Sequence, residues 1–430
     1  MGVDMLKKFS FKNYKSFKDS VTLDFTASKI REFNDSIISV GSEKVLPLIA
    51  LFGANASGKS TVYAAFEYMS EYVAYSFRYG DEEENVEEYK PIPFLLDSYS
   101  VNNESEFEIY FTIPGDKTEK SYNYGFCIDK NGIKEEWLRY KAKTARKYSN
   151  IFTRKNDDID LSGLPKKSRD NILVSLEKQV LIVSLGAKLK IDKCKMVRDW
   201  FINNEFADFG NPFTNLVLSR MLPDGFVDDE VVQKDIIRYF DTFGEHIVGF
   251  HIEKDIREVD SKSDIYTIYV KHRMMDGDGC SEIPLSAESA GTLKMFALYS
   301  MLNEVFKKGS VLFIDELNAR LHPLLVRNII EAFMNPDINV KQAQIVFTSH
   351  DTWQMSSKLL RRDEIWFTEK DDNGISRLYS LAEYDPSEEQ NGKKVTIRKD
   401  ENYEKNYLLG NYGAVPVIKK LEMLGGGEDN

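Results

Sequence analysis

The sequence is poor in cysteine, in long apolar runs and in net positive charge. Its three cysteines, Cys127, Cys194 and Cys280, lack the spacing of a zinc site or a disulfide framework. No apolar run approaches the length that crosses a membrane, and the N-terminal stretch carries lysines where a signal peptide needs an apolar region. These absences favour a soluble protein of the reducing cytoplasm.

The charge balance disfavours broad binding to nucleic acid. The chain has 57 Lys and Arg against 69 Asp and Glu, a formal net charge of −12, which repels a phosphate backbone. A basic stretch at 134–155 keeps a local nucleic-acid patch open, although a solvated surface segment is the simpler explanation. With 42% hydrophobic residues, the 430-residue chain can form one large or two ordinary globular domains.

A phosphate-binding loop of the pattern G-x-x-x-x-G-K-[ST] lies between an apolar, strand-like run and a helix-compatible run, which is the context that confirms this motif. Glycines permit backbone geometries that a Cβ blocks, so loop amides can face phosphate oxygens. We expect Lys59 to bridge the β- and γ-phosphates of ATP and the Ser60 hydroxyl to ligate Mg²⁺. The predicted nucleotide-binding residues are Gly53, Asn55, Ala56, Ser57, Gly58, Lys59, Ser60 and Thr61.

Two adjacent acids, Asp315 and Glu316, end a second apolar run. An exposed acidic pair that caps a strand is the alternative, but four apolar residues at 311–314 favour a central parallel strand. Buried carboxylates need a positive partner, and a nucleotide-bound Mg²⁺ provides one. The sequence therefore predicts Asp315 as a metal ligand and Glu316 as the group that polarises a water for attack on the γ-phosphate.

Strand and helix patterns alternate along much of the chain. Alternation at 105–113 and 121–129 predicts an antiparallel hairpin, whereas helical periodicity with polar breaks dominates 141–245. Strand patterns return at 263–274 and 344–351, with helical runs between them. Buried parallel strands that alternate with helices predict an α/β fold of the phosphate-loop type, interrupted by a largely helical insertion.

Three further motifs surround these elements. The stretch SAESAGTLK (286–294) precedes a predicted helix, and a Ser-x-Gly at a helix start can bind an anion. TSHD (348–351) follows an apolar strand, where His350 can sense a γ-phosphate, although a structural histidine is as common there. KNYKSF (12–17) lies in the first strand pair. Each motif alone is weak, since Ser and Gly are ordinary helix-start residues.

In this order, the motifs resemble an ABC-type ATPase head, in the branch that includes the RecF, SMC and OLD-nuclease ATPases. The resemblance implies an ABC-ATPase-like P-loop head with a parallel core sheet and an antiparallel β subdomain, in which two heads enclose two ATP molecules. By position, Ser289 and Gly291 would then act in trans on the partner's nucleotide, and His350 would be the switch histidine. His322 would lie at the dimer seam, and Lys15 near the α-phosphate or ribose.

The sequence departs from that branch at several points. Asn318 stands where the family usually has Asp, and the signature is Ser-Ala-Gly-Thr instead of Ser-Gly-Gly-Gln. No convincing Q-loop glutamine lies between Lys59 and Ser289. These departures weaken a transporter-type interpretation.

The closing stretch at 401–418 resembles the tail of Rlo- and AbiL-type ATPases of the AAA-15/21 group, as do 91–97 and 122–138. Such ATPases accompany a separately encoded nuclease-like protein in bacterial anti-phage modules, so the tail is expected to dock a partner. An aromatic segment that packs on its own domain is the alternative. Asp371 and Asp372 suit a hairpin turn better than a metal site, and the segment after that hairpin is too short for an OLD-type nuclease domain.

We therefore expect the first part of the head at 1–140, a helical insertion at 141–245, the second part of the head at 246–385, and a C-terminal tail at 386–430. The predicted function is a cytoplasmic ATPase switch in which Glu316, Lys59 and His350 are catalytic, and closure of a dimer or higher oligomer controls an effector nuclease. For this switch, nucleic acid is expected only as a secondary partner. The alternative function is a stand-alone RecF-like DNA-repair ATPase. A module that holds ATP without turnover is disfavoured by the intact Glu316.

Overall fold

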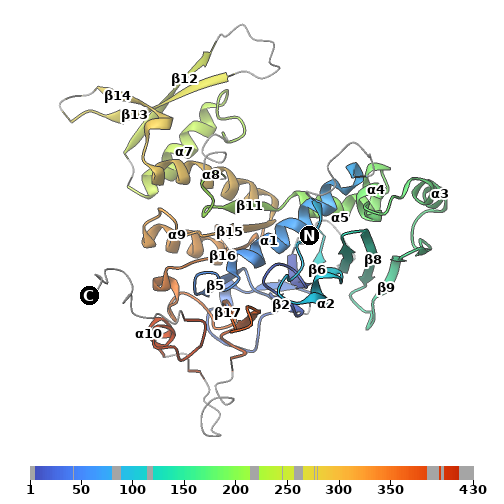
Figure 1. The fold of residues 1–430 in the computed structure, drawn as a ribbon. Helices are drawn as coiled ribbons and strands as arrows, with labels where there is room; N and C mark the ends of the chain where they lie inside the picture. The colour runs from blue at the N-terminus through green and yellow to red at the C-terminus, as the bar shows by residue number, and fades with distance from the viewer. Residues whose placement is uncertain are drawn as a thin grey trace, which may run out of the picture.

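The computed structural model describes residues 5–41, 43–79, 89–113, 120–213, 222–244, 246–255, 265–275, 277, 279–384, 397–398 and 401–415. Four sheets and the helices packed on them make up this part of the chain (Figure 1). Within it, no helix is both long and apolar enough to span a bilayer.

A six-stranded core sheet has the order β11-β15-β16-β5-β17-β18. Every neighbouring pair in it is parallel except the β17–β18 hairpin at its edge. All residues of β5, β15 and β16 are buried, which explains their continuous apolar runs, since parallel strands are covered on both faces. The strands are Leu48–Gly53 (β5), Glu205–Asp208 (β11), Val311–Asp315 (β15), Gln344–Thr348 (β16), Ile365–Lys370 (β17) and Ser376–Ser380 (β18).

Helices cover the two faces of the core sheet. One apolar cluster joins α1 (Lys59–Tyr75) and α5 (Asp192–Ile202) to one face, and another joins α8 (Ala290–Lys308) and α9 (Pro323–Met334) to the opposite face. Successive residues of β5 alternate between the two clusters, as the pleat of a strand requires. The carboxyl ends of the parallel strands therefore meet at one edge, beside the start of α1.

A seven-stranded antiparallel sheet, β10-β9-β8-β7-β6-β1-β2, lies beside α1 (Figure 1). It contains the predicted hairpin of β6 and β7. Together with the core sheet, it confirms the predicted fold class, an α/β, ABC-ATPase-like P-loop head with an antiparallel β subdomain. Its strands are Met5–Lys12 (β1), Val21–Asp24 (β2), Ser105–Thr112 (β6), Ser121–Asp129 (β7), Gly132–Lys141 (β8), Ser149–Lys155 (β9) and Asp158–Asp160 (β10).

A three-stranded sheet, β12-β13-β14, projects beyond α7 and α8 at the top of Figure 1. A short two-stranded sheet pairs β3 with β4. These and the remaining elements are Ile247–Asp255 (β12), Ile265–Arg273 (β13), Cys280–Pro284 (β14), Ile38–Val40 (β3), Glu43–Val45 (β4), Ser98–Val101 (α2), Lys166–Ser175 (α3), Ile182–Lys188 (α4), Glu230–Thr242 (α7), Tyr403–Leu408 (α10), and the 3₁₀ turns Asn34–Ser36, Ser76–Arg78, Leu285–Ala287 and Thr352–Gln354.

The predicted helical insertion at 141–245 needs correction. It contains α3, α4, α5 and α7, but β9 and β10 extend the antiparallel sheet, and β11 pairs in parallel with β15 in the core sheet. The boundary at 141 falls between two strands of one sheet. β10 and β11 have three and four residues, too few for the period-2 pattern that identifies a strand.

The described part of the predicted tail packs on its own domain, while the docking of a partner by the tail stays a prediction. Residues 401–415, called the C-terminal strap below, pack on the chain's own core: Tyr403, Tyr407 and Tyr412 are buried. The Tyr407 ring stacks on Phe367 of β17, with centroids 5.4 Å apart and planes 8° apart. This is the alternative in which the aromatic side chains pack on their own domain. The other tail residues, apart from 397 and 398, lie outside the described ranges.

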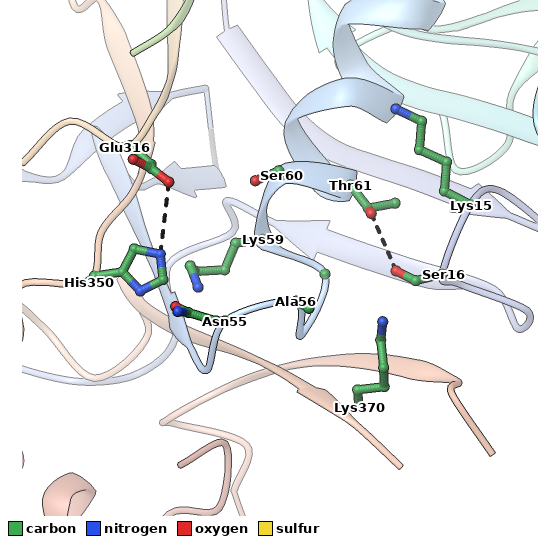
Figure 2. Close-up of a pocket in the computed structure, with 11 residues that line it drawn as sticks. Lys15, Ser16, Asn55, Ala56, Lys59, Ser60, Thr61, Glu316, His350 and Lys370 are labelled. Atoms are coloured by element: carbon green, nitrogen blue, oxygen red, sulfur yellow. Dashed lines mark hydrogen bonds and ion pairs between the residues drawn. The ribbon is translucent and has the colours of Figure 1, made fainter. Parts of the chain in front are cut away.

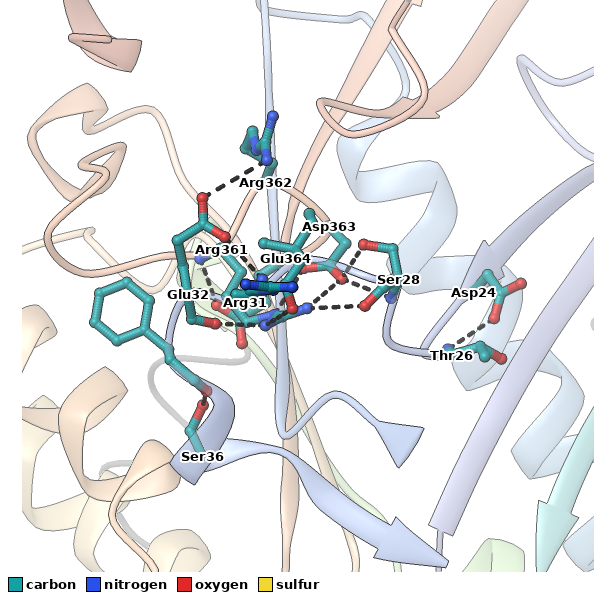
Figure 3. A network of polar contacts seen from close by, with 12 residues as sticks. Asp24, Thr26, Ser28, Arg31, Glu32, Ser36, Arg361, Arg362, Asp363 and Glu364 are labelled. Atoms are coloured by element: carbon teal, nitrogen blue, oxygen red, sulfur yellow. Dashed lines mark hydrogen bonds and ion pairs between the residues drawn. The ribbon is translucent and has the colours of Figure 1, made fainter. Parts of the chain in front are cut away.

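A buried ion-pair network holds the start of β17 (Figure 3). The fully buried Arg361 donates from Nε and Nη2 to both carboxylate oxygens of Asp363, at 2.9 and 2.8 Å. Its remaining donors reach carbonyls of the loop that follows β2, and Ser28 donates to Asp363 from that loop. Since every guanidinium nitrogen is engaged, the network acts as a structural clamp on the strand that supports the phosphate loop.

Candidate nucleotide site

A cavity of about 740 Å³ opens at the carboxyl edge of the core sheet, beside the start of α1. Three lysines, Lys15, Lys59 and Lys370, line it, and Glu316 and His350 lie on one side of it (Figure 2). The structure thus brings together residues predicted from four separate motifs. The complete lining is Lys15, Ser16, Asn55, Ala56, Gly58, Lys59, Ser60, Thr61, Glu316, His350 and Lys370.

The phosphate loop depends on glycine at both ends. Gly53 has φ +150° and Gly58 has φ +122°, backbone conformations that L side chains rarely adopt. A Cβ on Gly53 would lie 2.4 Å from the Thr368 carbonyl oxygen, and one on Gly58 would lie 2.9 Å from the Phe17 ring. Ser57 is buried and its Oγ lies 2.6 Å from Thr368 Oγ1, so β17 anchors the loop from behind.

Lys59 is held by the loop itself. Its Nζ donates to the carbonyl oxygens of Gly53 at 2.8 Å and Ala54 at 3.0 Å. Burial lowers the pKa of Lys59 to about 8, although the charges of Asp315 and Glu316 act in the opposite direction. An anion in the cavity would compensate this poorly solvated ammonium group.

Thr348, at the end of β16, fixes both acids of the neighbouring strand. Its Oγ1 donates to Asp315 Oδ1 at 2.5 Å and accepts from the Glu316 amide at 2.8 Å. Glu316 has φ +55°, a left-handed conformation that turns the chain out of β15 at this residue. Asp315 therefore stays buried at the strand end while the Glu316 carboxylate lines the cavity.

His350 lies next to Glu316 at the cavity wall, with Nε2 4.0 Å from Glu316 Oε1 (Figure 2). Burial and the nearby Lys59 charge lower the pKa of His350, while Glu316 and Asp315 oppose that shift. The His350 amide donates to Asn318 Oδ1 at 3.2 Å. Asn318, which replaces the family's usual Asp, thus makes a contact within its own chain.

The sequence prediction missed the turn that follows β11. Asp208 pairs in register with Asp315, and its Oδ1 accepts from the amides of Gly210 and Asn211, both at 3.0 Å. Burial raises the pKa of Asp208, and Asp315 raises it further. A Cβ on Gly210 would lie 2.9 Å from Glu316 Cδ, so glycine leaves room for that carboxylate.

The donors at this edge fit a magnesium ion. The Ser60 hydroxyl and the carboxylates of Asp315 and Asp208 are hard oxygen ligands of the kind that Mg²⁺ prefers, and the two carboxylates end neighbouring strands in register. The described residues contain no group of three or more His, Cys, Asp or Glu side chains that could hold a metal ion by themselves.

The NYKSF turn places Lys15 and Ser16 at the cavity. Asn13 and Lys15 have φ near +50°, and the Asn13 side chain donates to the Ser100 carbonyl at 2.8 Å, which holds the turn in place. Ser16 Oγ lies 3.3 Å from Thr61 Oγ1 and accepts from Ser376 Oγ. Burial lowers the pKa of Lys15. Lys15 therefore lines the cavity, and its place near the α-phosphate or ribose stays a prediction.

The predicted in-trans residues lie elsewhere. Ser289 caps α8 by accepting from the Thr292 amide at 3.1 Å, and neither Ser289 nor Gly291 lines the cavity. Ser289 is exposed to solvent. His322 caps α9 through Nδ1, which accepts from the Leu324 amide at 3.2 Å. These positions leave the signature residues available to a second molecule.

The C-terminal strap reaches the phosphate loop. The Ala414 carbonyl accepts from the Ala54 amide and from the Tyr407 hydroxyl, both at 3.1 Å. The Ala414 amide donates to Glu369 Oε1 at 3.1 Å. The strap thus positions the second residue of the loop, a contact that no motif in the sequence indicated.

Comparison with known proteins places these features in a family. The model of AAA_21, described as "AAA domain, putative AbiEii toxin, Type IV TA system", matches residues 48–352. No curated protein matches the chain. The chain is similar to the SMC head bound to the C-terminal winged-helix domain of ScpA (14% identity, 87% of this chain, 97% of that chain, TM-score 0.41). It is also similar to an Smc head domain with coiled coil and joint derived from Pyrococcus yayanosii (11% identity, 88% of this chain, 97% of that chain, TM-score 0.38). With TM-scores this low, neither similarity supports a conclusion about this chain.

Proposed function

The chain belongs to the AAA_21 family, and on that premise we propose that it is a Mg²⁺-dependent ATPase that works as a molecular switch. One observation carries the proposal: three lysines and a phosphate loop face the Glu316 carboxylate across a single cavity. The cations suit a triphosphate, and the carboxylate suits the activation of a water molecule.

The phosphate loop and Lys59 supply the binding step. ATP phosphates replace the Gly53 and Ala54 carbonyls as partners of the Lys59 ammonium group. The negative charge of the phosphates then offsets the hydration that the ammonium group loses through burial. Loop amides and the N-terminus of α1 donate to the same phosphates. Ser60 and Asp315 would hold Mg²⁺, which neutralises charge that develops on the phosphates.

Glu316 and His350 act on the far side of the γ-phosphate. Glu316 accepts a hydrogen bond from the attacking water, which orients that water for in-line attack. His350, whose pKa is lowered, can donate from a neutral ring nitrogen to the γ-phosphate. His350 lines the cavity at 4.0 Å from Glu316, which places it to contact a γ-phosphate bound there.

Ser289 and Gly291 act from a second copy of the chain in this proposal. Their position outside the cavity, and the exposure of Ser289 at the start of α8, support a role in trans. ATP then closes a dimer of heads, and hydrolysis reopens it. A switch of this kind changes affinity for a partner between its two states.

We propose an effector nuclease of an anti-phage system as that partner. The family description names a putative AbiEii toxin and a type IV toxin–antitoxin system, which agrees with a toxin-type partner. The choice of a nuclease rests on the resemblance to Rlo- and AbiL-type ATPases. The basic stretch at 134–155 gives less support to the rival DNA-repair function than its sequence suggests. Lys134 pairs with Asp129, Lys155 with Glu135, and Arg154 donates to the carbonyls of Val180 and Glu177, so part of the charge of this stretch is engaged within the chain.

Glu316→Gln tests the ATPase. The amide keeps the shape of the side chain but loses the base, so we expect ATP binding to persist and turnover to fall about 100-fold or more. The variant should accumulate as a dimer or higher oligomer in light scattering with ATP. Glu331→Gln on the outer face of α9 is the matched control. A monomeric Glu316→Gln variant with unchanged turnover would refute the mechanism.

A pull-down from the native host, with and without ATP, tests the partner. Stoichiometric recovery of a nuclease-like protein in one nucleotide state supports the switch. Recovery of DNA alone, lost as salt rises, favours the repair function instead.

A further inference from the structure

Lys294 is a buried lysine on the signature helix α8, three residues after Gly291. Its side chain is 5% exposed, and within the described residues its ammonium group makes no ion pair with a carboxylate. Instead, Nζ donates to three main-chain carbonyls, those of Glu316 at 3.3 Å, Leu317 at 2.8 Å and Ala319 at 2.7 Å. All three belong to the turn that begins with the proposed catalytic carboxylate.

An aromatic ring lies on another side of the same ammonium group. Lys294 Nζ is 3.9 Å from the centroid of the Phe209 ring, a cation–π contact. Phe209 belongs to the β11 turn, and its amide donates to the Asp315 carbonyl at 3.0 Å. Lys294 thus joins α8, the β11 turn and the turn after β15 at one point.

The turn after β15 needs such support because its backbone is strained. Glu316 has φ +55° and Arg320 has φ +59°, a region that non-glycine residues seldom occupy. Burial lowers the pKa of Lys294 to about 7, opposed by Glu316 and reinforced by Arg320. An apolar side chain would avoid this desolvation but would leave the three carbonyls without the donor that gathers them.

We propose that Lys294 is a positioning residue for ATP hydrolysis, which fixes the 316–319 turn and with it the Glu316 carboxylate. The inference rests on the proposed function. It also links two sites: α8 begins with Ser289 and Gly291, which serve the partner's nucleotide, whereas Glu316 serves its own.

The first test compares Lys294→Met with Lys307→Met, an exposed lysine at the other end of the same helix. Methionine keeps the length and loses the donors. We expect kcat to fall about tenfold or more in Lys294→Met, while KM and ATP affinity stay within about twofold of the parent. Lys307→Met should match the parent. An unchanged kcat, or a parallel loss of ATP affinity, would overturn the proposal.

A double variant separates action through Glu316 from an independent effect. If Lys294 acts only by placing Glu316, Lys294→Met should slow Glu316→Gln no further. Losses that multiply in the double variant would show that Lys294 acts by another route.

Hydrogen exchange tests the turn without any turnover. Amides of 316–320 should exchange faster in Lys294→Met than in the parent or in Lys307→Met. Lys294→Gln, which keeps two donors, should retain part of the protection and serves if the Met variant fails to fold. Unchanged exchange in the variants refutes the positioning role. A parent protein with normal protection but no ATP hydrolysis would instead refute the proposed function.

Discussion

Gly210→Ala should slow ATP hydrolysis while leaving ATP binding intact. The new Cβ would lie 2.9 Å from Glu316 Cδ, 3.1 Å from its Oε1 and 3.2 Å from Asp208 Oδ1. Carbon atoms pack at about 3.5–4.0 Å, so the Glu316 carboxylate must retreat by about half an ångström or more. A misplacement of 1 Å can cost about 100-fold in rate, so we expect a decrease in kcat of about tenfold.

The assay is steady-state phosphate release with a parallel titration of ATP affinity. Gly210 has no positive φ, and the atoms that the methyl group meets are the ends of side chains, so the fold should tolerate alanine. Gly249→Ala is the matched control, because its Cβ would meet only Lys271 at 3.5 Å or more, an ordinary contact. If Gly210→Ala hydrolyses ATP at the parental rate, the Glu316 position described here is not the one used in catalysis.

Two further predictions concern Lys59 and the strap. In the free protein the pKa of Lys59 is about 8, and bound phosphates raise it. ATP binding therefore takes up a proton above pH 8, and ATP affinity should fall as pH rises, by up to about tenfold per pH unit. Calorimetry in buffers of different ionisation enthalpy measures this proton uptake, and an ATP affinity that is constant between pH 7 and 10 would contradict the prediction. Tyr407→Phe removes one donor to the Ala414 carbonyl and should lower the free energy of unfolding by about 1 kcal/mol in urea titrations. Tyr99→Phe, at an exposed position, is the control and should leave the free energy of unfolding unchanged. Equal stabilities of the two variants would contradict the prediction.

The parts of the site that were predictable from sequence are those with a local pattern. The phosphate loop is contiguous, and its flanking strand and helix are long enough to show their periodicity. Asn55, Ala56 and the run from Gly58 to Thr61 line the cavity together, whereas Ser57 packs on Thr368 behind the loop. The Asp371 hairpin turn was likewise predictable, because its Oδ1 accepts from the amides of Asn373 and Ile375 within a few residues. Glu316 and His350 followed from apolar strands that end in polar residues.

The remaining parts depend on contacts between distant segments. Asp208 and Gly210 follow a strand of only four residues inside a region of helical periodicity, so nothing local marks them as neighbours of Glu316. Lys370 ends a hairpin strand that was predicted, but only the pairing of β17 with β5 brings it to the phosphate loop. Lys294 looks like an ordinary helix lysine until the turn carbonyls are seen around it.

The strap also bears on how the protein is made. The phosphate loop leaves the ribosome early, but the carbonyl that meets the Ala54 amide belongs to Ala414. Strand β17, which buttresses Ser57, is also synthesised late. The loop therefore reaches its described form only once synthesis has passed Ala414. A nascent chain that stalls before this point carries the phosphate-loop sequence without the Ala54–Ala414 hydrogen bond, so this contact of the loop forms only after nearly all of the rest of the chain has been made.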